Sequence, residues 1–182
     1  MAVLEIVRMG HPVLRAPAAP VPASAMRGAA FARLVDDMVE TMRAEGGVGL
    51  AAPQVGIGWC LFVLEVSGPG PEAIPLRVVV NPELTPEPGE PVEDWEGCLS
   101  IPDLRGLVPR HHAVRVHALD RHGAPSEYRV EGFEARIVQH ENDHLDGVLF
   151  LDRMRDLRSL AFYDEWHRYV LGSAGSRAER PE

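Results

Sequence analysis

The segment at residues 140–144, with the sequence His-Glu-Asn-Asp-His, constrains the fold of this chain more than any other. Two histidines four residues apart lie on one face of a helix, so both imidazoles can reach the same metal ion. This is the H-E-x-x-H arrangement of hydrolytic metal enzymes. The pattern predicts a helix over about residues 134–146, with Glu141 placed to take a proton from a reacting water.

A third ligand is needed for such an ion, and Cys98 is the candidate. A lone cysteine is more often a small buried residue, but Gly97 permits unusual backbone angles and Pro102 fixes the exit of the segment. Two histidines, one thiolate and an open position are typical of a catalytic site rather than a closed structural one. Cys60 lies in an apolar run and is predicted to be a small core residue.

Length and composition limit the class of protein. The chain has 182 residues, and we expect one domain over residues 1–172 followed by a disordered tail at 173–182. A net charge of −9 argues against a dedicated nucleic-acid binder. No apolar run is long enough to cross a membrane, and the first residues lack the apolar core of a secretory signal. We therefore expect a cytoplasmic protein.

The apolar pattern predicts an α+β fold of helices mixed with hairpin-connected strands. Prolines at 12, 17, 20 and 22 favour an extended N-terminal segment. The predicted elements are a helix capped by Ser24 and ended by Gly46, buried strands at 59–66 and 77–81, a strand pair around 114–118 and 128–130, and a final helix over about 155–171.

A glycine-rich segment at residues 46–56 is the third candidate for function. It lacks the Lys-Ser/Thr pair of a phosphate-binding loop, so a phosphate cradle is a poor interpretation. A flexible loop is the plain alternative, although Leu50 and its neighbours are apolar and suited to packing. Gln54 offers an amide N–H that could stabilise a developing oxyanion.

Taken together, three motifs make the chain resemble the peptide deformylases of the bacterial type. They are G-x-G-L-A-A-x-Q at 47–54, E-G-C-L-S at 96–100 and Q-H-E-x-D-H at 139–144, and the resemblance extends from Val3 to about Met154. It implies antiparallel sheets packed around a central helix that carries H-E-x-x-H, together with N-terminal and C-terminal helices. It also implies a metal-dependent hydrolase that removes the formyl group from the N-terminal formyl-methionine of nascent polypeptides and releases formate.

The resemblance also implies a role for each residue of the site. The metal ligands would be Cys98, His140 and His144. Glu141 would be the acid/base, and Gln54 and the backbone N–H of Leu99 would hold the formyl oxygen. The residues expected to contact the peptide are Gly49 and Gly97, at its backbone, and Val48, Phe133 and Ile137, around the methionine side chain.

The identity of the metal and the partners are further expectations from the resemblance. Fe²⁺ is the expected native ion, and Zn²⁺, Ni²⁺ or Co²⁺ could occupy the same site, whereas the ligand set alone suggests zinc. N-formylmethionyl nascent peptides are the expected substrates, and we expect a transient contact with the ribosome. Because all three motifs precede Arg153, the segment after it is predicted to be dispensable for chemistry on short peptides.

Two helix residues and three other functions remain open at this stage. Arg136 is expected at the rim of the methionine pocket with a packed stem and a solvated head. Asp143 could bond a ligating imidazole or pair with an arginine such as Arg110. The alternatives for function are a zinc endopeptidase, a binding module with a structural metal, which needs a fourth ligand, and a scaffold without metal.

Overall fold

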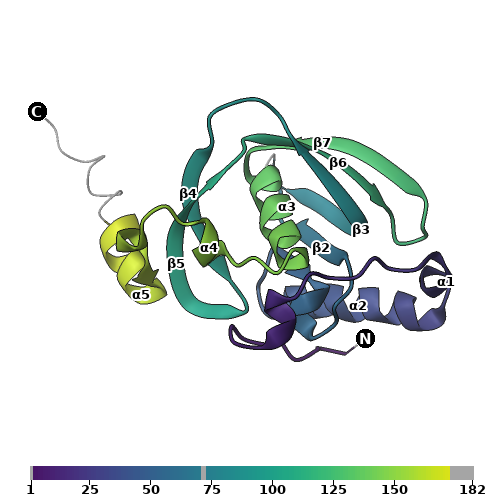
Figure 1. Cartoon of the computed structure of the whole chain (residues 1–182). Coiled ribbons are helices and arrows are strands. Elements are labelled where there is room, and N and C mark those ends of the chain that lie inside the picture. The colour runs from purple at the N-terminus through teal and green to yellow at the C-terminus, as the bar shows by residue number, and fades with distance from the viewer. Residues whose placement is uncertain (1, 71–72, 173–182) are drawn as a thin grey trace, which may run out of the picture.

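A computed structural model describes residues 2–70 and 73–172 of the chain, so the tail predicted at 173–182 lies outside the described residues. Two antiparallel sheets lie on either side of helix α3 (Gly132–Leu145) (Figure 1). The predicted α+β class and the central helix with H-E-x-x-H are confirmed.

Five antiparallel strands form the larger sheet, in the spatial order β1-β2-β3-β6-β7. They are β1 (Gly49–Ala51), β2 (Leu61–Val66), β3 (Ile74–Pro86), β6 (Ala113–Leu119) and β7 (Pro125–Glu131). The long strand β3 pairs with β2 as far as Val80 and with β6 from Glu83 onward. β6 and β7 form the predicted strand pair and stay in register along their whole length.

A smaller sheet, in the order β4-β5-β8, faces the other side of α3. It consists of β4 (Val92–Cys98), β5 (Ile101–Arg110) and β8 (Ala161–Phe162). β4 and β5 pair from Val92 opposite Arg110 to Cys98 opposite Ile101, with a tight turn between the last pair. This hairpin therefore carries Cys98 at its closed end, next to α3.

Helix α3 uses two faces, and this sets the position of the site. Ala135, Val138 and Leu145 are buried in the core beneath the larger sheet. The side of the helix that carries His140 and His144 instead meets the β4–β5 hairpin, because His140 contacts Glu96 and His144 contacts Cys98. The histidines are thus held between two sheets by a helix that is anchored on its opposite side.

The other helices surround this arrangement. α2 (Ala29–Ala44) is the predicted amphipathic helix, and its apolar face is buried in a second core beside β2. That face includes Phe31, Val35, Met38 and Met42. The shorter elements are α1 (Ala23–Met26), α4 (Phe150–Arg153), α5 (Tyr163–Trp166) with a π-helical turn at His167–Leu171, and 3-10 turns at Pro12–Arg15, Ala52–Val55 and Leu157–Ser159. Among the described residues, no helix combines the length and apolar character needed to cross a membrane.

Several boundaries differ from the sequence-based predictions. The predicted final helix over 155–171 is wrong in its first half, since Leu160 packs against the core under β5 and residues 161–162 pair with β5. Ser24 is not a helix cap, because α1 begins at Ala23. Cys60 is only partly buried, but it packs against the core as predicted and its thiol donates to the Ala18 carbonyl at 3.2 Å.

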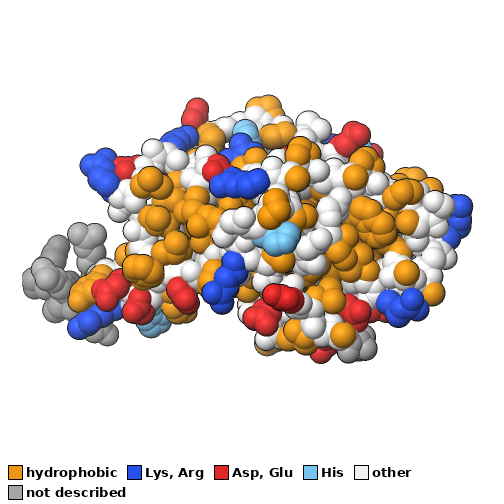
Figure 2. Space-filling model, turned by 60° about the horizontal axis from the view of Figure 1, so that its bottom comes forward, with side chains coloured by type: hydrophobic (Ala, Val, Ile, Leu, Met, Phe, Trp, Pro, Cys, Tyr) orange, Lys and Arg blue, Asp and Glu red, His pale blue; other side chains and the backbone are white. Residues whose placement is uncertain are grey.

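The surface carries charges of both signs. On the face drawn in Figure 2, the described arginine and acidic side chains are interspersed with apolar ones and form no continuous basic surface.

Candidate active site

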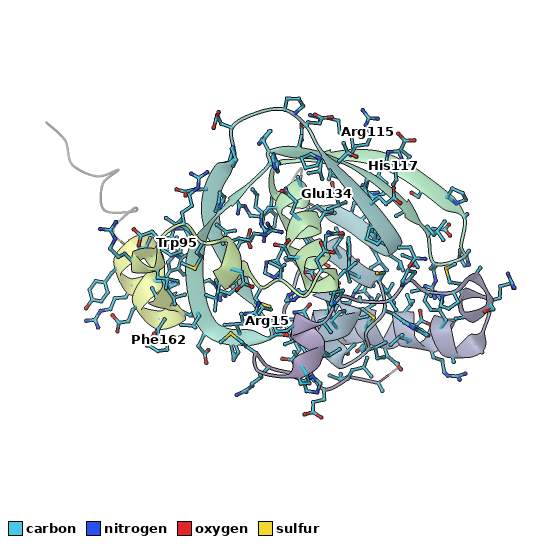
Figure 3. All side chains as sticks on the ribbon, in the orientation of Figure 1. Arg15, Trp95, Arg115, His117, Glu134 and Phe162 are labelled. Atoms are coloured by element: carbon cyan, nitrogen blue, oxygen red, sulfur yellow. The ribbon has the colours of Figure 1, made fainter. Side chains whose placement is uncertain are left out.

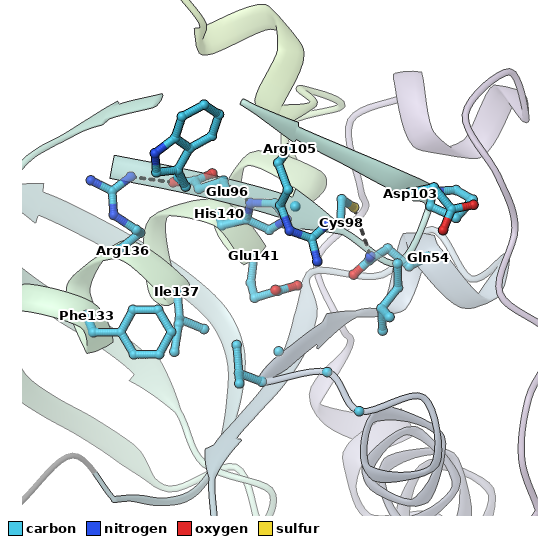
Figure 4. A pocket seen from close by; sticks show the side chains of 18 residues that line it. Gln54, Glu96, Cys98, Asp103, Arg105, Phe133, Arg136, Ile137, His140 and Glu141 are labelled. Carbon is cyan, nitrogen blue, oxygen red and sulfur yellow. Dashed lines mark hydrogen bonds and ion pairs between the residues drawn. The ribbon is translucent and has the colours of Figure 1, made fainter. Parts of the chain in front are cut away.

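A cavity of about 410 Å³ opens between α3, the β4–β5 hairpin and the glycine-rich segment before β1 (Figure 4). Its lining includes every residue predicted to be catalytic, metal-binding or substrate-binding except His144, namely Val48, Gly49, Gln54, Gly97, Cys98, Leu99, Phe133, Ile137, His140 and Glu141. His144 is 1% exposed and lies behind this wall, in contact with Cys98. The three motifs, far apart in sequence, are thus brought to one cavity.

The predicted ligand atoms converge at the base of the cavity. Those of Cys98, His140 and His144 all lie within 4.8 Å of one another, and Cys98 Sγ is 3.3 Å from His144 Nε2. The histidines meet there because they are one helical turn apart on α3. One sulfur and two imidazole nitrogens suit a single divalent metal ion and leave a position open.

The surroundings of the two imidazoles differ. His140 Nδ1–H donates to Glu96 Oε2 at 2.9 Å, which leaves Nε2 as the free nitrogen. Burial lowers the pKa of His144 well below its usual range and so favours the neutral ring. Burial also opposes a charge on His140, but Cys98 and Glu96 outweigh it and raise the pKa of His140 well above its usual range. The same negative field favours a cation between these residues.

Glu96 belongs to a buried network of charges behind the ligands. Arg110 donates to both carboxylate oxygens of Glu96 at 2.9 Å and to Asp143 at 2.6 Å. Arg153 adds a second donor to Asp143 at 2.7 Å. Burial alone would raise the pKa of Glu96, but the hydrogen bonds from Arg110 and His140 hold it well below its usual range. The carboxylate that orients His140 is therefore ionised and fixed.

Glu141 lies in the wall of the cavity and is 4% exposed. A Cβ at Gly49 would overlap its carboxylate, so only glycine lets β1 approach so closely. Burial raises the pKa of Glu141 to about 7, and its Oε2 has no hydrogen-bond partner among the described residues. A buried carboxyl group that titrates near neutral pH and has a free oxygen is suited to move a proton.

Gln54 is held rigidly at the opposite side of the ligands. Its Oε1 accepts from the backbone N–H of Ala51 at 2.8 Å, and its Nε2 donates to Cys98 Sγ at 3.5 Å. The amide therefore directs its N–H groups toward the ligand atoms, as an oxyanion donor would require. Leu99 follows Cys98 in the tight turn, and its side chain packs 2.9 Å from where a Cβ on Gly47 would lie.

The two open questions about α3 are resolved by the charge network. Asp143 pairs with Arg110, the second of the two alternatives, and with Arg153. The prediction for the head of Arg136 is wrong. Arg136 is 7% exposed, and its guanidinium donates to Glu96 and to the carbonyls of Val92 and Val108. Arg136 does line the cavity.

Sequence reasoning missed several residues of the site. Glu96 stands in the E-G-C-L-S motif, two residues before Cys98. A ligating histidine usually donates its second N–H to an acceptor such as a carboxylate, and this rule could have identified Glu96 as the partner of His140. Trp95, Asp103 and Arg105 also line the cavity, and nothing in their local pattern indicates this. They reach it because the β4–β5 hairpin forms one wall.

A sequence model of the family described as "Polypeptide deformylase" matches residues 3–159, which include all three motifs. The chain belongs to the peptide deformylase family. Its activity is therefore the removal of the N-formyl group from nascent peptides.

Individual deformylases agree with this assignment over most of their length. The chain is 43% identical over 162 residues to Peptide deformylase 2 of Pseudomonas putida, covering 87% of this chain and 91% of that one. It is 46% identical over 167 residues to Peptide deformylase 1 of Streptomyces coelicolor, covering 87% and 76%.

Solved structures of deformylases show the same fold. The class I type b enzyme from Acinetobacter baumannii with bound Met-Ala-Ser matches with a TM-score of 0.79 and 40% identity, covering 84% of this chain and 99% of that one. A deformylase from Legionella pneumophila matches with a TM-score of 0.78 and 36% identity, covering 99% and 100%. The fold of this chain is therefore that of the deformylase family.

Proposed function

We propose that this deformylation is a metal-dependent hydrolysis of N-terminal formyl-methionine that releases formate, with the ion held by Cys98, His140 and His144. The observation that carries the proposal is the convergence of these three ligand atoms within 4.8 Å, beside the buried carboxyl of Glu141. When bound, a divalent ion supplies Lewis acidity, which polarises a carbonyl and makes water nucleophilic near neutral pH.

In this proposal Glu141 carries the proton. It takes a proton from the attacking water and delivers it to the nitrogen of the departing amine. Its pKa of about 7, raised by burial, allows it to be present in both forms at neutral pH. Its free Oε2 supports this role, because no described residue occupies that oxygen.

Gln54 and Leu99 stabilise the oxygen of the formyl group. As the carbonyl carbon becomes tetrahedral, negative charge develops on this oxygen, and preorganised donors lower its free energy. The support for Gln54 is its fixed amide, which Ala51 holds at 2.8 Å. Leu99 contributes its backbone N–H from the turn that follows Cys98.

The methionine side chain enters between Val48, Phe133 and Ile137, and Gly49 and Gly97 contact the peptide backbone. In support, all five residues line the cavity, and Phe133 is 53% exposed there although it is a large apolar residue. An exposed aromatic ring beside an open cavity suits an apolar ligand. A relative of 40% identity has been solved with the peptide Met-Ala-Ser bound.

The proposal extends to the native ion and the cellular setting. Fe²⁺ is the expected native metal, with Zn²⁺, Ni²⁺ or Co²⁺ as possible substitutes, since the ligand set accepts each of them. The enzyme is expected to act in the cytoplasm, with one catalytic domain over residues 1–172, and to contact the ribosome transiently while it meets formylated nascent chains.

The decisive experiment is formate release from formyl-Met-Ala-Ser by protein purified without oxygen, with metal content measured on the same sample. We expect formate in proportion to bound metal and its loss after chelation. Casein serves as the control substrate. Cleavage of casein without formate release would instead support a zinc endopeptidase.

A further inference from the structure

The C-terminal segment reaches the wall of the active-site cavity. β8 pairs with β5, where Ala161 lies opposite Arg105 and Phe162 opposite Leu104. α5 follows directly and packs beside the β4–β5 hairpin (Figure 1). Figure 3 shows Trp95 and Phe162 on the side of this hairpin where α5 lies. Residues distant from all three motifs are thus neighbours of the site.

A continuous series of ring contacts connects this segment with the cavity. The guanidinium carbon of Arg105 lies 4.7 Å from the ring centroid of Tyr163. Tyr163 is 5.7 Å from Trp166, and Trp166 is 5.8 Å from Trp95. Arg105 and Trp95 both line the cavity. The series therefore begins and ends at residues of the cavity wall and passes through α5 between them.

Arg105 is placed to bind a ligand in the cavity. Its guanidinium points into the cavity (Figure 4), and a Cβ at Gly97 would overlap it. Nη1 donates to the Leu104 carbonyl at 2.8 Å, and the remaining N–H groups have no acceptor among the described residues. Arg136, the other arginine of the lining, is by contrast occupied by Glu96 and backbone carbonyls. Arg105 thus offers unused donors to oxygen atoms that pass over Gly97.

We propose that Tyr163 is a positioning residue, which holds the Arg105 guanidinium over Gly97 so that it binds substrate oxygens downstream of the methionine. The proposal rests on the proposed function, because Gly97 is assigned there to the peptide backbone. A guanidinium over an aromatic face is held by the charge distribution of the ring. The bound oxygen would be a backbone carbonyl in a nascent chain or the terminal carboxylate in a short peptide.

Kinetics with two substrates test the proposal. Tyr163→Leu should raise KM for formyl-Met-Ala-Ser by about 2- to 5-fold, the effect of one exposed cation–π contact, with kcat unchanged. KM for formyl-methionine amide, which ends before Arg105 is engaged, should not change. Tyr163→Phe keeps the ring and should restore the KM of the parent. Phe162→Ala, at a side chain that is 64% exposed, is the matched control and should change neither constant.

A double variant separates positioning from a general loss of structure. In an Arg105→Ala background, Tyr163→Leu should have no further effect on KM, because the guanidinium that Tyr163 positions has been removed. A further effect there, or an equal rise in KM for both substrates, would overturn the proposal. Comparing formyl-Met-Ala-Ser with its C-terminal amide distinguishes the carboxylate from the carbonyl. Absence of formate release by the parent protein would count against the proposed function and not against the role of Tyr163.

Discussion

Glu96 Oε2 lies 2.9 Å from Nδ1 of His140, so a carboxylate of the β4 strand orients an imidazole of helix α3. The two residues are 44 positions apart in sequence, and the contact joins the hairpin to the helix at the point where the ligands meet. Arg110 and Arg136 bind the same carboxylate from other sides. The smaller sheet therefore both supplies Cys98 and fixes the ring of one histidine of the proposed metal site.

The first prediction concerns this contact. Glu96→Gln should lower the affinity for the metal by about 10- to 100-fold, because an amide accepts the imidazole N–H less strongly and no longer pairs with Arg110. The measurement is competition for the metal with a chromogenic chelator. Glu65→Gln, which removes an ion pair with Arg43 but changes no ligand and no member of the Glu96 charge network, is the control and should leave affinity unchanged. Equal affinities for the two variants would contradict the role of Glu96.

The two cysteines provide a second test of the ligand set. Cys98→Ser should lose most metal affinity, since a hydroxyl replaces a thiolate poorly at neutral pH. Cys60→Ser should keep its metal and most of its activity, because Cys60 only donates to the Ala18 carbonyl and a hydroxyl can do the same. The metal content of both purified variants, measured per protein molecule, shows which cysteine is the ligand. The opposite pattern would show that the third ligand is wrongly assigned.

The residues proposed as ligands and as acid/base could be singled out from the sequence because their chemistry depends on short spacings. His140 and His144 share a face on any helix, and Glu141 stands beside the first of them whatever the rest of the fold does. Cys98 is a candidate ligand because Gly97 and Pro102 shape its turn. These inferences needed only local geometry and the known preferences of metal ions.

The β4–β5 hairpin was not predictable for an equally local reason. The first three residues of β4 are exposed, so the strand lacks the alternation of apolar and polar residues that indicates a half-buried strand. Arg136 was misjudged because a helical arginine is normally solvated. Its partners Glu96, Val92 and Val108 are 28 to 44 residues away in sequence, and no pattern near Arg136 reveals them.

Removal of the Glu141 carboxyl separates catalysis from metal binding. Glu141→Ala should abolish formate release and retain the metal, because Glu141 moves the proton and is not one of the three ligands. Asn142→Ala, at the next position of the same helix, is the control for helix perturbation. Near-normal turnover by Glu141→Ala, or complete loss of its metal, would contradict the assigned role.

Gly49 tests whether the position of Glu141 matters as much as its charge. A methyl group at Gly49 would overlap the Glu141 carboxylate and displace it, and a displacement of about 1 Å can cost about 100-fold in rate. Gly49→Ala should therefore lower kcat strongly while metal content stays constant. Gly58→Ala, whose new Cβ would meet only Val13 at 3.9 Å, should behave like the parent. An active Gly49→Ala enzyme would show that the close approach of β1 is not required.

The last prediction concerns stability in alkali and lies away from the site. Burial raises the pKa of Tyr128 from 10.0 to about 12, and its hydroxyl has no partner among the described residues. The unfolded chain therefore loses the phenol proton at a lower pH than the folded protein does. The contribution of neutral Tyr128 to the free energy of unfolding is fully present below pH 10 and is lost as the pH rises through 12. Tyr128→Phe should remove this loss. Urea midpoints at pH 8, 10 and 11 measure it, with the exposed Tyr169→Phe as control. A parent and a Tyr128→Phe protein that lose stability equally between pH 10 and 11 would show that the phenol ionises as freely in the fold as outside it.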